Sequence, residues 1–416
     1  MDRRKIAVIG GGPAGLMAAE TLARAGLAVT VCERMASLGR KFLLAGRGGL
    51  NFTHSEPLPA FLERYGTIDP RLRAAIEAFP PASLRAWCED LGQPTFAGSS
   101  GRVFPKAMKA SPLLRAWLRR LVELGVRFET GQRWTGWASD GALTFQSTNG
   151  TETHVTADAT ILALGGASWP RLGSDGGWVP ILAASGAAIT PLMAANCGVR
   201  IEWSAYFRER FAGEPLKRIV IGVSGSIARG EAMITADGLE GGAVYSLGPA
   251  IRSALAAGEK CQLILDLKPD QDLLGITGRL SRARRKLSLS NYLRKVVALS
   301  PAAIALLHEG HGKFLPAEPG ALAAAIRSVP LAITGLGGIE RAISTAGGVA
   351  WSAIDDRFML KAMPGTFAAG EMLDWEAPTG GYLLQACFAT GVAAARGAMT
   401  YLECNTAPPD GRANSE

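Results

Sequence analysis

Short apolar runs separated by glycine-rich turns mark both ends of the chain. At the start, the apolar run 5–9 leads into a glycine-rich turn, a largely apolar helical stretch and a second apolar run that ends at Glu33. This order predicts a β–α–β unit with parallel strands. Near the other end, the run 367–370 leads through a further glycine-rich turn into an apolar helical stretch at 383–399. The two ends therefore predict parts of one interrupted domain.

Between these ends the pattern changes. Residues 58–128 have apolar positions at helical spacing, and 126–165 alternate in the manner of strands. Strand-like pieces from about 192 predict an antiparallel sheet or barrel, followed by a helical and basic stretch. The expected parts are a discontinuous first domain at 1–190 and 345–405, a β-barrel-like insertion at 191–273 and 330–344, a helical basic subdomain at 274–329, and a disordered tail at 406–416.

The turn after the first strand has the pattern Gly10-x-Gly12-x-x-Gly15. In such a turn the first glycine permits the tight bend, the second lets the backbone approach a pyrophosphate, and the third lets helix and strand pack closely. Helix N–H groups and the helix dipole then hold the negative charge. Glu33 ends the second strand, where a carboxylate can accept hydrogen bonds from ribose hydroxyls and would repel a 2′-phosphate. The pattern favours the adenosine end of NAD or FAD over NADP.

Composition limits the class of protein. Hydrophobic residues make up 48% and charged residues 19% of the 416 residues, which indicates a globular protein of two or three domains. No apolar run has the length of a membrane span, and the glycine fingerprint occupies the place where a signal peptide would be apolar. Six cysteines without C-x-x-C or metal spacing indicate reduced thiols in a cytoplasmic protein.

Charge and histidine spacing exclude little by themselves. The net charge of +8 fits nucleic acid, an acidic substrate or an anionic membrane surface. The densest basic run, 282–286, has no interleaved aromatic residue, which favours a solvated helix face over a nucleic-acid site. His308 and His311 lack the HExxH spacing and a third ligand, so we predict no metal site. A second GxGxxG unit is not found, which disfavours a built-in nicotinamide domain.

Several motifs resemble those of the aminoacetone-oxidase-like flavoproteins, also called the BaiN/RdsA family of NAD(P)/FAD-dependent oxidoreductases. They are the opening IGGGPAGLMAA, the stretch from Gly39-Arg40-Lys41 to Asn51, the runs 163–168 and 345–349 and, most specifically, FAAGEMLD…PTGGYLLQACFATG from 367. The resemblance covers most of the chain. It implies an α/β fold class, with a Rossmann-like FAD-binding domain of the two-dinucleotide-binding-domain type interrupted by an inserted β-barrel plus helical domain.

By position, the resemblance also implies which residues hold the cofactor. Glycines of the fingerprint would surround the pyrophosphate, and Glu33 would bind ribose. Arg40 and Lys41 would lie on the adenosine–phosphate side, and the last third would supply the ribityl and isoalloxazine contacts. The expected cofactor-binding residues are Gly10, Gly12, Pro13, Ala14, Gly15, Glu33, Arg34, Arg40, Lys41, Asn51, Gly165, Gly370, Glu371, Asp374, Gly380, Gly381, Tyr382, Leu383 and Leu384.

One loop departs from the family pattern. Most members read Gly-Arg-Cys-Asn where this chain reads Gly48-Gly49-Leu50-Asn51, so the Arg and Cys positions are Gly and Leu here. If that Arg or Cys acts in chemistry or substrate binding elsewhere, this chain does something different. The run 49–57, GLNFTHSEP, is similar to a subgroup of these flavoproteins that carries GLNxTHSEP.

Two residues are candidates for acid–base chemistry. His54 lies in the loop expected beside the cofactor, and imidazole suits proton transfer at neutral pH. Tyr382 stands at the start of the C-terminal helix, whose free N–H groups are placed to stabilise negative charge on reduced flavin. Each has a structural alternative: His54 as a hydrogen-bonding turn residue or a solvated one, and Tyr382 as a packing residue against the flavin.

The flavin would carry the reaction, while the protein binds and orients it. We expect an FAD-dependent oxidoreductase that transfers hydride between flavin and a small organic substrate. A reductase would be reduced by NAD(P)H at a transient site, whereas an oxidase would oxidise an amine or alcohol and pass electrons to O₂. An RNA-modifying flavoprotein that holds tRNA on the basic middle segment and a flavin-binding protein without turnover are further alternatives. The sequence leaves substrate and oligomeric state open.

Overall fold

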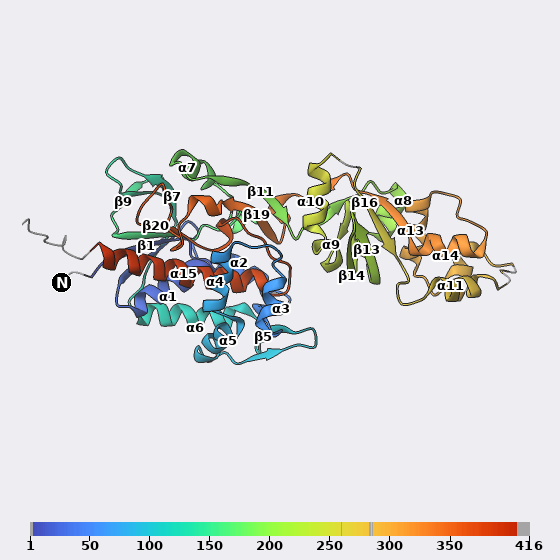
Figure 1. The fold of residues 1–416 in the computed structure, drawn as a ribbon, viewed down its shortest axis with the longest axis horizontal. Helices are drawn as coiled ribbons and strands as arrows, with labels where there is room; N and C mark the ends of the chain where they lie inside the picture. The colour runs from blue at the N-terminus through green and yellow to red at the C-terminus, as the bar shows by residue number, and fades with distance from the viewer. Residues whose placement is uncertain (1–2, 259, 283, 285, 406–416) are drawn as a thin grey trace, which may run out of the picture. The chain divides into compact units, whose positions relative to one another are not determined.

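The computed structural model describes residues 3–405 except 259, 283 and 285, so the expected disordered tail at 406–416 lies outside the described residues. The chain divides into two compact units, one formed by residues up to Met193 and from Ser344 onwards, the other by Ala194–Ile343 (Figure 1). Each unit has its own cluster of buried hydrophobic residues. A core of its own is what a separate domain requires.

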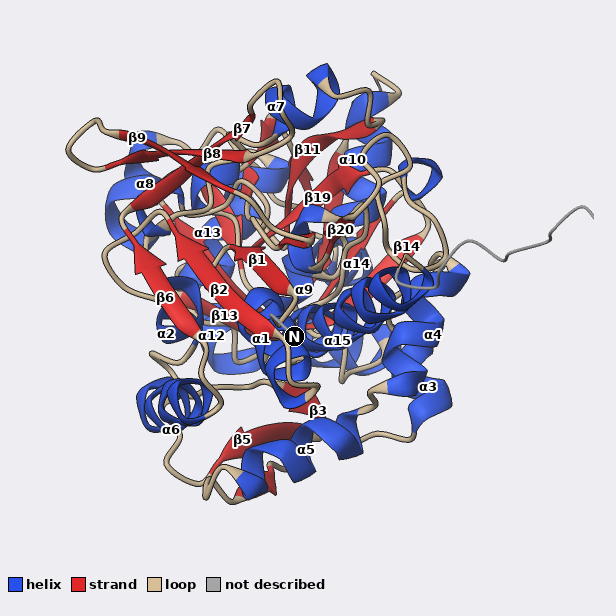
Figure 2. Cartoon of the chain, turned by 90° about the vertical axis from the view of Figure 1, so that its left-hand side faces the viewer, coloured by secondary structure: helices blue, strands red, loops and turns tan. Residues whose placement is uncertain are grey.

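The first unit is built around a five-stranded sheet of order β20-β10-β1-β2-β6. Its strands are β1 (Lys5–Ile9), β2 (Ala28–Glu33), β6 (Arg127–Thr130), β10 (Ala159–Leu162) and β20 (Thr366–Ala368). All pairings are parallel, with Val8 opposite Ile161 on one side and Val31 on the other. Figure 2 shows β1, β2 and β6 side by side. The carboxyl ends of the strands therefore meet at one edge of the sheet.

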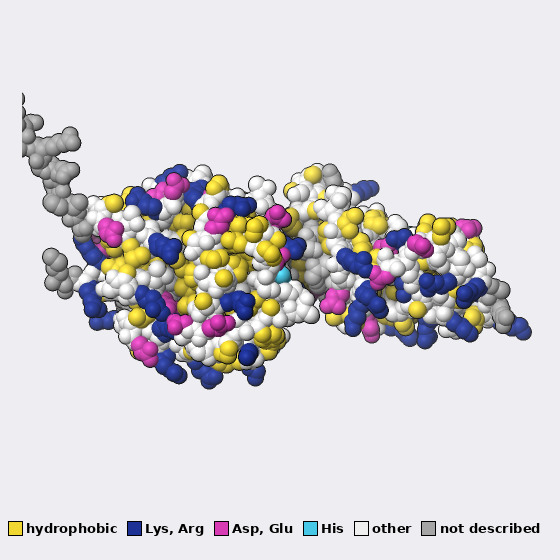
Figure 3. Space-filling model, turned by 60° about the horizontal axis from the view of Figure 1, so that its bottom comes forward, with side chains coloured by type: hydrophobic (Ala, Val, Ile, Leu, Met, Phe, Trp, Pro, Cys, Tyr) yellow, Lys and Arg dark blue, Asp and Glu magenta, His cyan; other side chains and the backbone are white. Residues whose placement is uncertain are grey.

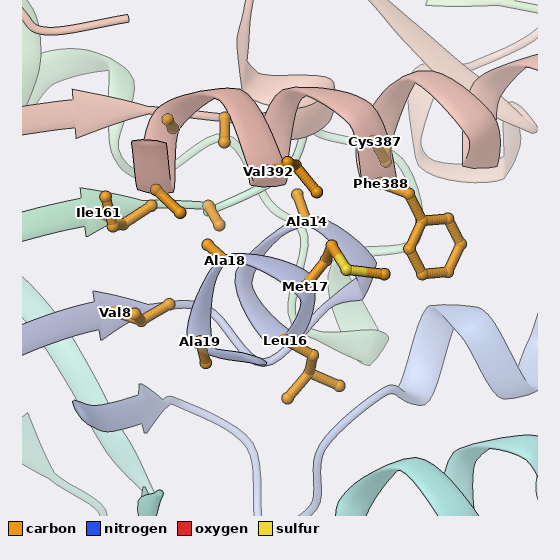
Figure 4. Packing of buried hydrophobic residues seen from close by; sticks show 14 of the residues in the cluster. Val8, Ala14, Leu16, Met17, Ala18, Ala19, Ile161, Cys387, Phe388 and Val392 are labelled. Atoms are coloured by element: carbon orange, nitrogen blue, oxygen red, sulfur yellow. The ribbon is translucent and has the colours of Figure 1, made fainter. Parts of the chain in front are cut away.

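Two helices cross next to this sheet. α1 (Pro13–Arg24) follows β1, and α15 (Tyr382–Cys404) is the last element described. Figure 4 shows Ala14, Ala18 and Val392 between the two helices. A Cβ at Gly391 would lie 2.4 Å from the carbonyl oxygen of Ala14, so the two backbones nearly touch. Small residues on both helices permit this approach, and it buries α15 along most of its length.

Smaller elements complete the first unit. One three-stranded antiparallel sheet has the order β3-β5-β4, another has the order β7-β8-β9, and β11 pairs with β19. These strands are β3 (Thr53–His54), β4 (Thr95–Ala97), β5 (Arg102–Pro105), β7 (Gln132–Trp137), β8 (Leu143–Ser147), β9 (Glu152–Val155), β11 (Ile189–Ala195) and β19 (Ser344–Val349). The helices are α2 (Arg40–Ala45), α3 (Leu58–Glu63), α4 (Pro70–Ala78), α5 (Pro81–Asp90), α6 (Ala110–Glu123) and α7 (Val179–Ala184), with the 3-10 turns η1 (Pro170–Leu172), η3 (Trp351–Ala353) and η4 (Gly370–Met372).

The second unit contains a seven-stranded sheet of order β17-β16-β13-β14-β15-β12-β18, in which all pairings are antiparallel. Its strands are β12 (Val199–Arg200), β13 (Pro215–Val223), β14 (Ser226–Thr235), β15 (Gly238–Glu240), β16 (Gln262–Asp266), β17 (Val329–Ala332) and β18 (Gly335–Leu336). Its helices are α8 (Ala205–Phe211), α9 (Gly242–Tyr245), α10 (Gly248–Ala256), α11 (Leu273–Leu280), α12 (Leu289–Val296), α13 (Pro301–His311) and α14 (Pro319–Arg327), with the turn η2 (Ile339–Arg341).

The element types follow the sequence patterns. Helices occupy most of 58–123, strands most of 127–162, and α15 extends the apolar helical stretch expected at 383–399. In the middle, antiparallel strands precede the helices of 273–327, and both belong to one compact unit. Within the described residues, no helix combines the length and apolar character needed to cross a membrane.

Candidate functional site

Three turns with glycines of positive φ meet at the carboxyl edge of the parallel sheet. β1 ends before Gly10, β10 leads to Gly165 and β20 leads to Gly370, with φ of 108°, 70° and 81°. A Cβ at Gly10 would lie 2.3 Å from the carbonyl oxygen of Ala163, and one at Gly370 would lie 2.7 Å from the Cβ of Ala14. The structure thus brings together the expected residues of the N-terminal turn and those after the later strands.

The fingerprint positions need glycine for different physical reasons. A Cβ at Gly15 would lie 1.9 Å from the carbonyl oxygen of Gly10, so the chain itself requires glycine there. Gly12 has an ordinary φ of −87°, and a Cβ there would meet nothing within 4 Å. Only a ligand beside the backbone would require glycine at this position. α1 starts at Pro13 without a side-chain cap, which fits an anionic pyrophosphate at its N-terminus.

Arg40, like Gly12, indicates a ligand beside the fingerprint turn. The N–H of Gly39 donates to the carbonyl oxygen of Gly11 at 2.9 Å, which places the start of α2 against the fingerprint turn. The Nε atom of Arg40 is buried and has no hydrogen-bond partner among the described residues. A buried guanidinium nitrogen ordinarily has an acceptor, and an anionic group of a bound nucleotide would supply one.

Glu33 and Arg34 point to different partners. The carboxylate of Glu33 accepts hydrogen bonds from the N–H of Gly11 at 2.8 Å and of Met35 at 2.9 Å, so it fixes the fingerprint turn and keeps acceptor capacity for ribose hydroxyls. Arg34 instead pairs with Asp175 at 2.5 Å. Burial alone would raise the pKa of Asp175, but the hydrogen bonds from Arg34 and from the N–H of Gly177, together with the positive charges of Arg34 and Arg133, lower it below its ordinary value.

Lys41 of α2 and Glu371, in the turn that follows β20, form an ion pair. The Nζ atom of Lys41 lies 2.8 Å from Oε2 of Glu371 and 3.0 Å from the hydroxyl of Ser168. The other oxygen of Glu371 accepts from the N–H of Thr345 at 3.0 Å. The resemblance assigns Lys41 and Glu371 to different parts of the cofactor, whereas here they are direct partners. The pair joins segments 330 residues apart and lies beside Gly165.

Asn51 and Asp374 are held by the chain itself. The amide of Asn51 donates to the carbonyl oxygens of Thr53 at 2.8 Å and Val103 at 3.2 Å. The carboxylate of Asp374 accepts from the hydroxyl of Thr190 at 2.6 Å. Asn51 therefore orders the loop before β3, and Asp374 is tied to β11 rather than to the fingerprint turn.

The first turn of α15 is another helix start in the site without a side-chain cap. Gly380 and Gly381 have φ of 127° and 98°, and no side chain caps the helix. A Cβ at Gly381 would lie 2.6 Å from the backbone nitrogen of Thr53, so β3 lies directly against this turn. Tyr382 is buried and Leu383 and Leu384 are half-buried in the first turn. The N–H groups of this turn are thus available to a carbonyl or an anion.

The two acid–base candidates lie side by side. The rings of His54 and Tyr382 stack with centroids 5.6 Å apart. The hydroxyl of Tyr382 donates to Oε1 of Glu56, and Oε2 of Glu56 accepts from Arg64 at 3.0 and 3.2 Å. Burial and the bond to Glu56 raise the pKa of Tyr382 well above its ordinary value. A hydroxyl held in this way keeps its proton.

His54 has both ring nitrogens engaged. The N–H of Glu56 donates to Nδ1 at 3.2 Å, and Nε2 lies 3.0 Å from the carbonyl oxygen of Ser100. Because Nδ1 accepts an N–H, the proton shared with the carbonyl is assigned to Nε2. It favours the structural alternative for His54, a turn residue that orders its own loop. The catalytic role of His54 stays a prediction.

The loop that departs from the family pattern is closed to a larger side chain. Gly49 has φ of 114°, and a Cβ there would lie 2.7 Å from the methyl carbon of Met108. Leu50 is fully buried, and its N–H donates to the carbonyl oxygen of Met108 at 2.7 Å. An arginine at 49 would be strained, and residue 50 packs in the core. Positions 49 and 50 therefore supply neither a guanidinium nor a thiol.

Sequence reasoning missed Glu56 and Arg64. Glu56 lies within the run THSEP, which was noted only for its resemblance, and Arg64 follows α3 without any motif. Tyr382, the partner of Glu56, is more than 300 residues away in the chain, so local pattern carries no signal for that contact. Ser168 and Thr345 lie within noted glycine runs, but their bonds to Lys41 and to the N–H of Ala167 were likewise not foreseen.

Among the described residues, the cysteines are not part of a metal-binding cluster. Cys32 and Cys387 are buried, as expected for core residues, and burial raises the pKa of Cys32 to about 12. Across the part of the chain that the structure describes, no three His, Cys, Asp or Glu side chains converge as metal ligands would. His308 and His311 each bond a backbone carbonyl, of Gly312 and Ala325 respectively.

The chain is similar in sequence to proteins of named activity. The 3-dehydro-bile acid delta(4,6)-reductase of Clostridium scindens is 26% identical over 414 residues, which is 95% of this chain and 98% of the relative. The ribosomal RNA dihydrouridine synthase of Haemophilus influenzae is 47% identical over 53 residues, or 13% of each chain.

Solved structures share the fold at low sequence identity. A flavocytochrome c3 fumarate reductase is 16% identical with a TM-score of 0.53, covering 96% of this chain and 78% of its own. The 3-ketosteroid delta1-dehydrogenase of Sterolibacterium denitrificans is 12% identical with a TM-score of 0.55, covering 96% of this chain and 100% of its own. The expected Rossmann-like domain is thereby confirmed in its fold.

The family assignment rests on the sequence as a whole. The model of the family described as "HI0933-like protein Rossmann domain" matches residues 4–397. The match spans the fingerprint, the glycine runs and the start of α15, and it confirms the expected resemblance together with an FAD-dependent oxidoreductase as the class of enzyme. This chain therefore belongs to the HI0933-like family of Rossmann-type flavoproteins.

Proposed function

We propose that this chain is an FAD-dependent reductase that saturates a carbon–carbon double bond conjugated with a carbonyl group. The observation that carries the proposal is the similarity, over nearly the full length, to a reductase of 3-dehydro bile acids. In such a substrate, double bonds at positions 4 and 6 are conjugated with the 3-keto group. Conjugation makes the far carbon of the double bond electrophilic, so that hydride addition there is favourable.

The residues at the carboxyl edge of the sheet fit FAD. Gly12 and the N-terminus of α1 would hold the pyrophosphate, with Arg40 as a further donor and Glu33 on the adenosine ribose. The first turn of α15, after Gly380 and Gly381, would face the isoalloxazine. FAD, once bound and reduced, supplies the hydride. The uncapped N–H groups of α15 favour the negative charge that accompanies reduction.

Saturation of the double bond also consumes a proton. Tyr382, the first residue of α15, carries a hydroxyl, but its proton is held by Glu56. The loop that holds Asn51 offers no thiol in its place, because residue 50 is a buried leucine. We propose that the proton comes from solvent or from a group beside the bound substrate. Tyr382 is then a positioning residue in the first turn of α15. NAD(P)H is the proposed electron donor, at a transient site.

Anaerobic flavin spectroscopy tests this function. The holoprotein is titrated with NADH and then NADPH, and the reduced protein is mixed with a 3-keto-4-ene steroid or with its saturated analogue as matched control. We expect bleaching of the flavin by a nicotinamide and reoxidation by the enone only. Reoxidation by both compounds, or by neither, would count against the proposed substrate class. Rapid reduction by amines or alcohols with turnover on O₂ would favour the oxidase alternative.

An RNA substrate is the second candidate. It is favoured by the local match to a ribosomal RNA dihydrouridine synthase, because uracil also contains a double bond conjugated with a carbonyl. Residues 273–308 contain seven Lys or Arg and no Asp or Glu, and Arg282, Arg284 and Lys286 are exposed. Figure 3 shows Lys and Arg side chains gathered on the face of the second unit. Phe314, 84% exposed, is an aromatic surface on which a base can stack.

Salt-dependent binding separates the two candidates. Binding of a uridine-rich RNA is measured over a range of salt concentrations for the holoprotein, for Arg282→Ala with Arg284→Ala, and for Arg208→Ala with Arg210→Ala on α8 as control. If this segment binds phosphates, RNA binding should be weaker and should depend less steeply on salt concentration only in Arg282→Ala with Arg284→Ala. Equal binding by all three proteins would remove this segment from consideration.

A further inference from the structure

The carboxylate of Glu56, which the sequence did not predict as a site residue, lies near the start of α15. Its side chain is 11% exposed, and its bonds join three segments: the loop after β3, the end of α3 and the first residue of α15. We propose that Glu56 is a positioning residue that fixes the flavin-facing turn of α15 through the hydroxyl of Tyr382, and so sets how strongly that turn stabilises reduced flavin. The inference rests on the proposed binding of FAD.

The two oxygens of Glu56 have different partners. Oε1 accepts the hydroxyl of Tyr382, and Oε2 accepts both Nε and Nη2 of Arg64. Burial alone would raise the pKa of Glu56, but the bonds from Tyr382 and Arg64 lower it below its ordinary value. The carboxylate is therefore charged at neutral pH and holds the tyrosine as a charge-assisted acceptor, the stronger class of hydrogen bond.

The same turn is held from its other side. The hydroxyl of Tyr65 donates to the backbone carbonyl of Tyr382 at 2.7 Å, and the hydroxyl of Thr53 donates to the side chain of Gln385 at 2.7 Å. Thr53 and Tyr65 stand on either side of Glu56 in the chain. The backbone of Thr53 also touches Gly381. The segment 53–65 therefore fixes both ends of one helical turn.

The position of this turn explains why its fixation matters. Thr390 and Gly391 of α15 contact Gly370 and Ala14 at the fingerprint, so the first residue of the helix lies about 12–14 Å further along at 1.5 Å per residue. A five-carbon ribityl chain separates the pyrophosphate from the ring in FAD, which suits this offset. The helix dipole acts within its first turn, so a small shift of Tyr382 changes its effect on the ring.

A double-mutant cycle on the holoprotein tests the inference. The flavin midpoint potential is measured by dye equilibration for Tyr382→Phe, for Glu56→Gln and for the double variant, with the dissociation constant of FAD as second readout. Tyr382→Phe keeps the ring and the charge of Glu56 but removes the bond. We expect an about tenfold loss in the preference for reduced over oxidised flavin, equal to about 30 mV towards negative potential.

The sign and additivity of the Glu56→Gln effect decide how Glu56 acts. If Glu56 works through Tyr382, this variant also shifts the potential negatively, and the double variant shifts it no further than Tyr382→Phe alone. A positive shift, or an effect that persists undiminished in the Phe background, would mean that the charge acts directly through space and would overturn the inference. Unchanged potentials in all variants would overturn it as well.

Two controls keep the outcomes separate. Glu63→Gln, an exposed carboxylate at the end of α3, should leave the potential unchanged. If Glu56→Gln does not fold, as judged by circular dichroism, Tyr382→Phe and Arg64→Met carry the test. A wild-type protein that binds no FAD would refute the proposed function itself, whereas a wild-type holoprotein with variants of equal potential would refute only the positioning role.

Discussion

At the scale of single residues, the three fingerprint glycines are alike in sequence but not in physical role. Gly10 and Gly15 are required by backbone contacts within the chain, while Gly12 borders open space at the start of α1. Substitutions at Gly10 and Gly12 should therefore have separable consequences. A substitution at Gly10 should act on folding, and a substitution at Gly12 should act on cofactor affinity.

Gly12→Ala should weaken FAD binding without unfolding the protein. A methyl group there meets no protein atom within 4 Å but would obstruct the approach of the pyrophosphate. We expect the dissociation constant of FAD to rise about tenfold, or about 1.4 kcal/mol. Fluorescence titration of the apoprotein measures it, and an unchanged unfolding midpoint of the apoprotein is the control. An FAD affinity equal to wild type would show that the pyrophosphate lies elsewhere.

Gly10→Ala, in contrast, should lower the stability of the fold. At φ of 108° a methyl group is strained, and it would lie 2.3 Å from the carbonyl oxygen of Ala163. Such strain costs about 1–3 kcal/mol. We expect the free energy of unfolding of the apoprotein to fall by that order in urea titrations. A fully stable Gly10→Ala protein would contradict the close approach of the turns after β1 and β10.

Glu56 also predicts how stability depends on pH. Because its pKa in the folded protein is lowered, its charged form contributes stability above the ordinary value of 4.5, and that contribution is lost as pH falls through the lowered pKa. Wild type should therefore be more stable than Glu56→Gln near neutrality, and the difference should shrink in acid. Urea unfolding at several pH values measures both proteins. A difference that is constant with pH would contradict an ionised Glu56 in this network.

At the scale of elements, the packing of α1 on α15 depends on Gly391. A Cβ there would lie 2.4 Å from the carbonyl oxygen of Ala14, which no rotamer change can relieve. Gly391→Ala gains helix propensity but should force the helices apart, for a net loss of about 1–3 kcal/mol. Thermal unfolding compared with Arg396→Ala, an exposed position on the same helix, measures the effect. Stabilisation would mean that the two helices can separate freely.

The elements themselves were largely predictable, and the reasons are physical. Period and burial are local properties, so the buried strands β1 and β10 and the long apolar helix α15 could be located from their own residues. The fingerprint could be assigned a ligand class because every glycine in it has a known steric role. Local sequence carries no such information on Glu56 with Tyr382 or Lys41 with Glu371, because those contacts depend on how distant strands and helices are arranged.

At the scale of the whole molecule, the separate cores predict that the units fold independently. The middle unit, Ala194–Ile343, begins within β11 and is followed by β19, and these two strands pair with each other. Its replacement by a short Gly-Ser linker should leave a first unit that still unfolds cooperatively and still binds FAD. Calorimetry and flavin absorbance of the shortened protein measure both properties. An insoluble or flavin-free product would contradict a self-sufficient first unit.

The parallel sheet also constrains how the protein is made. Its order, β20-β10-β1-β2-β6, places the last strand that the structure describes beside a strand that ribosomes finish some 200 residues earlier, and α15 emerges later still. At about 5–20 residues per second, translation leaves an incomplete sheet for roughly 10–40 s while the middle unit is synthesised. During that interval β10 has an unpaired apolar edge. Nascent chains that stall before residue 366 should therefore depend on chaperones, and FAD can bind a complete site only once α15 has emerged.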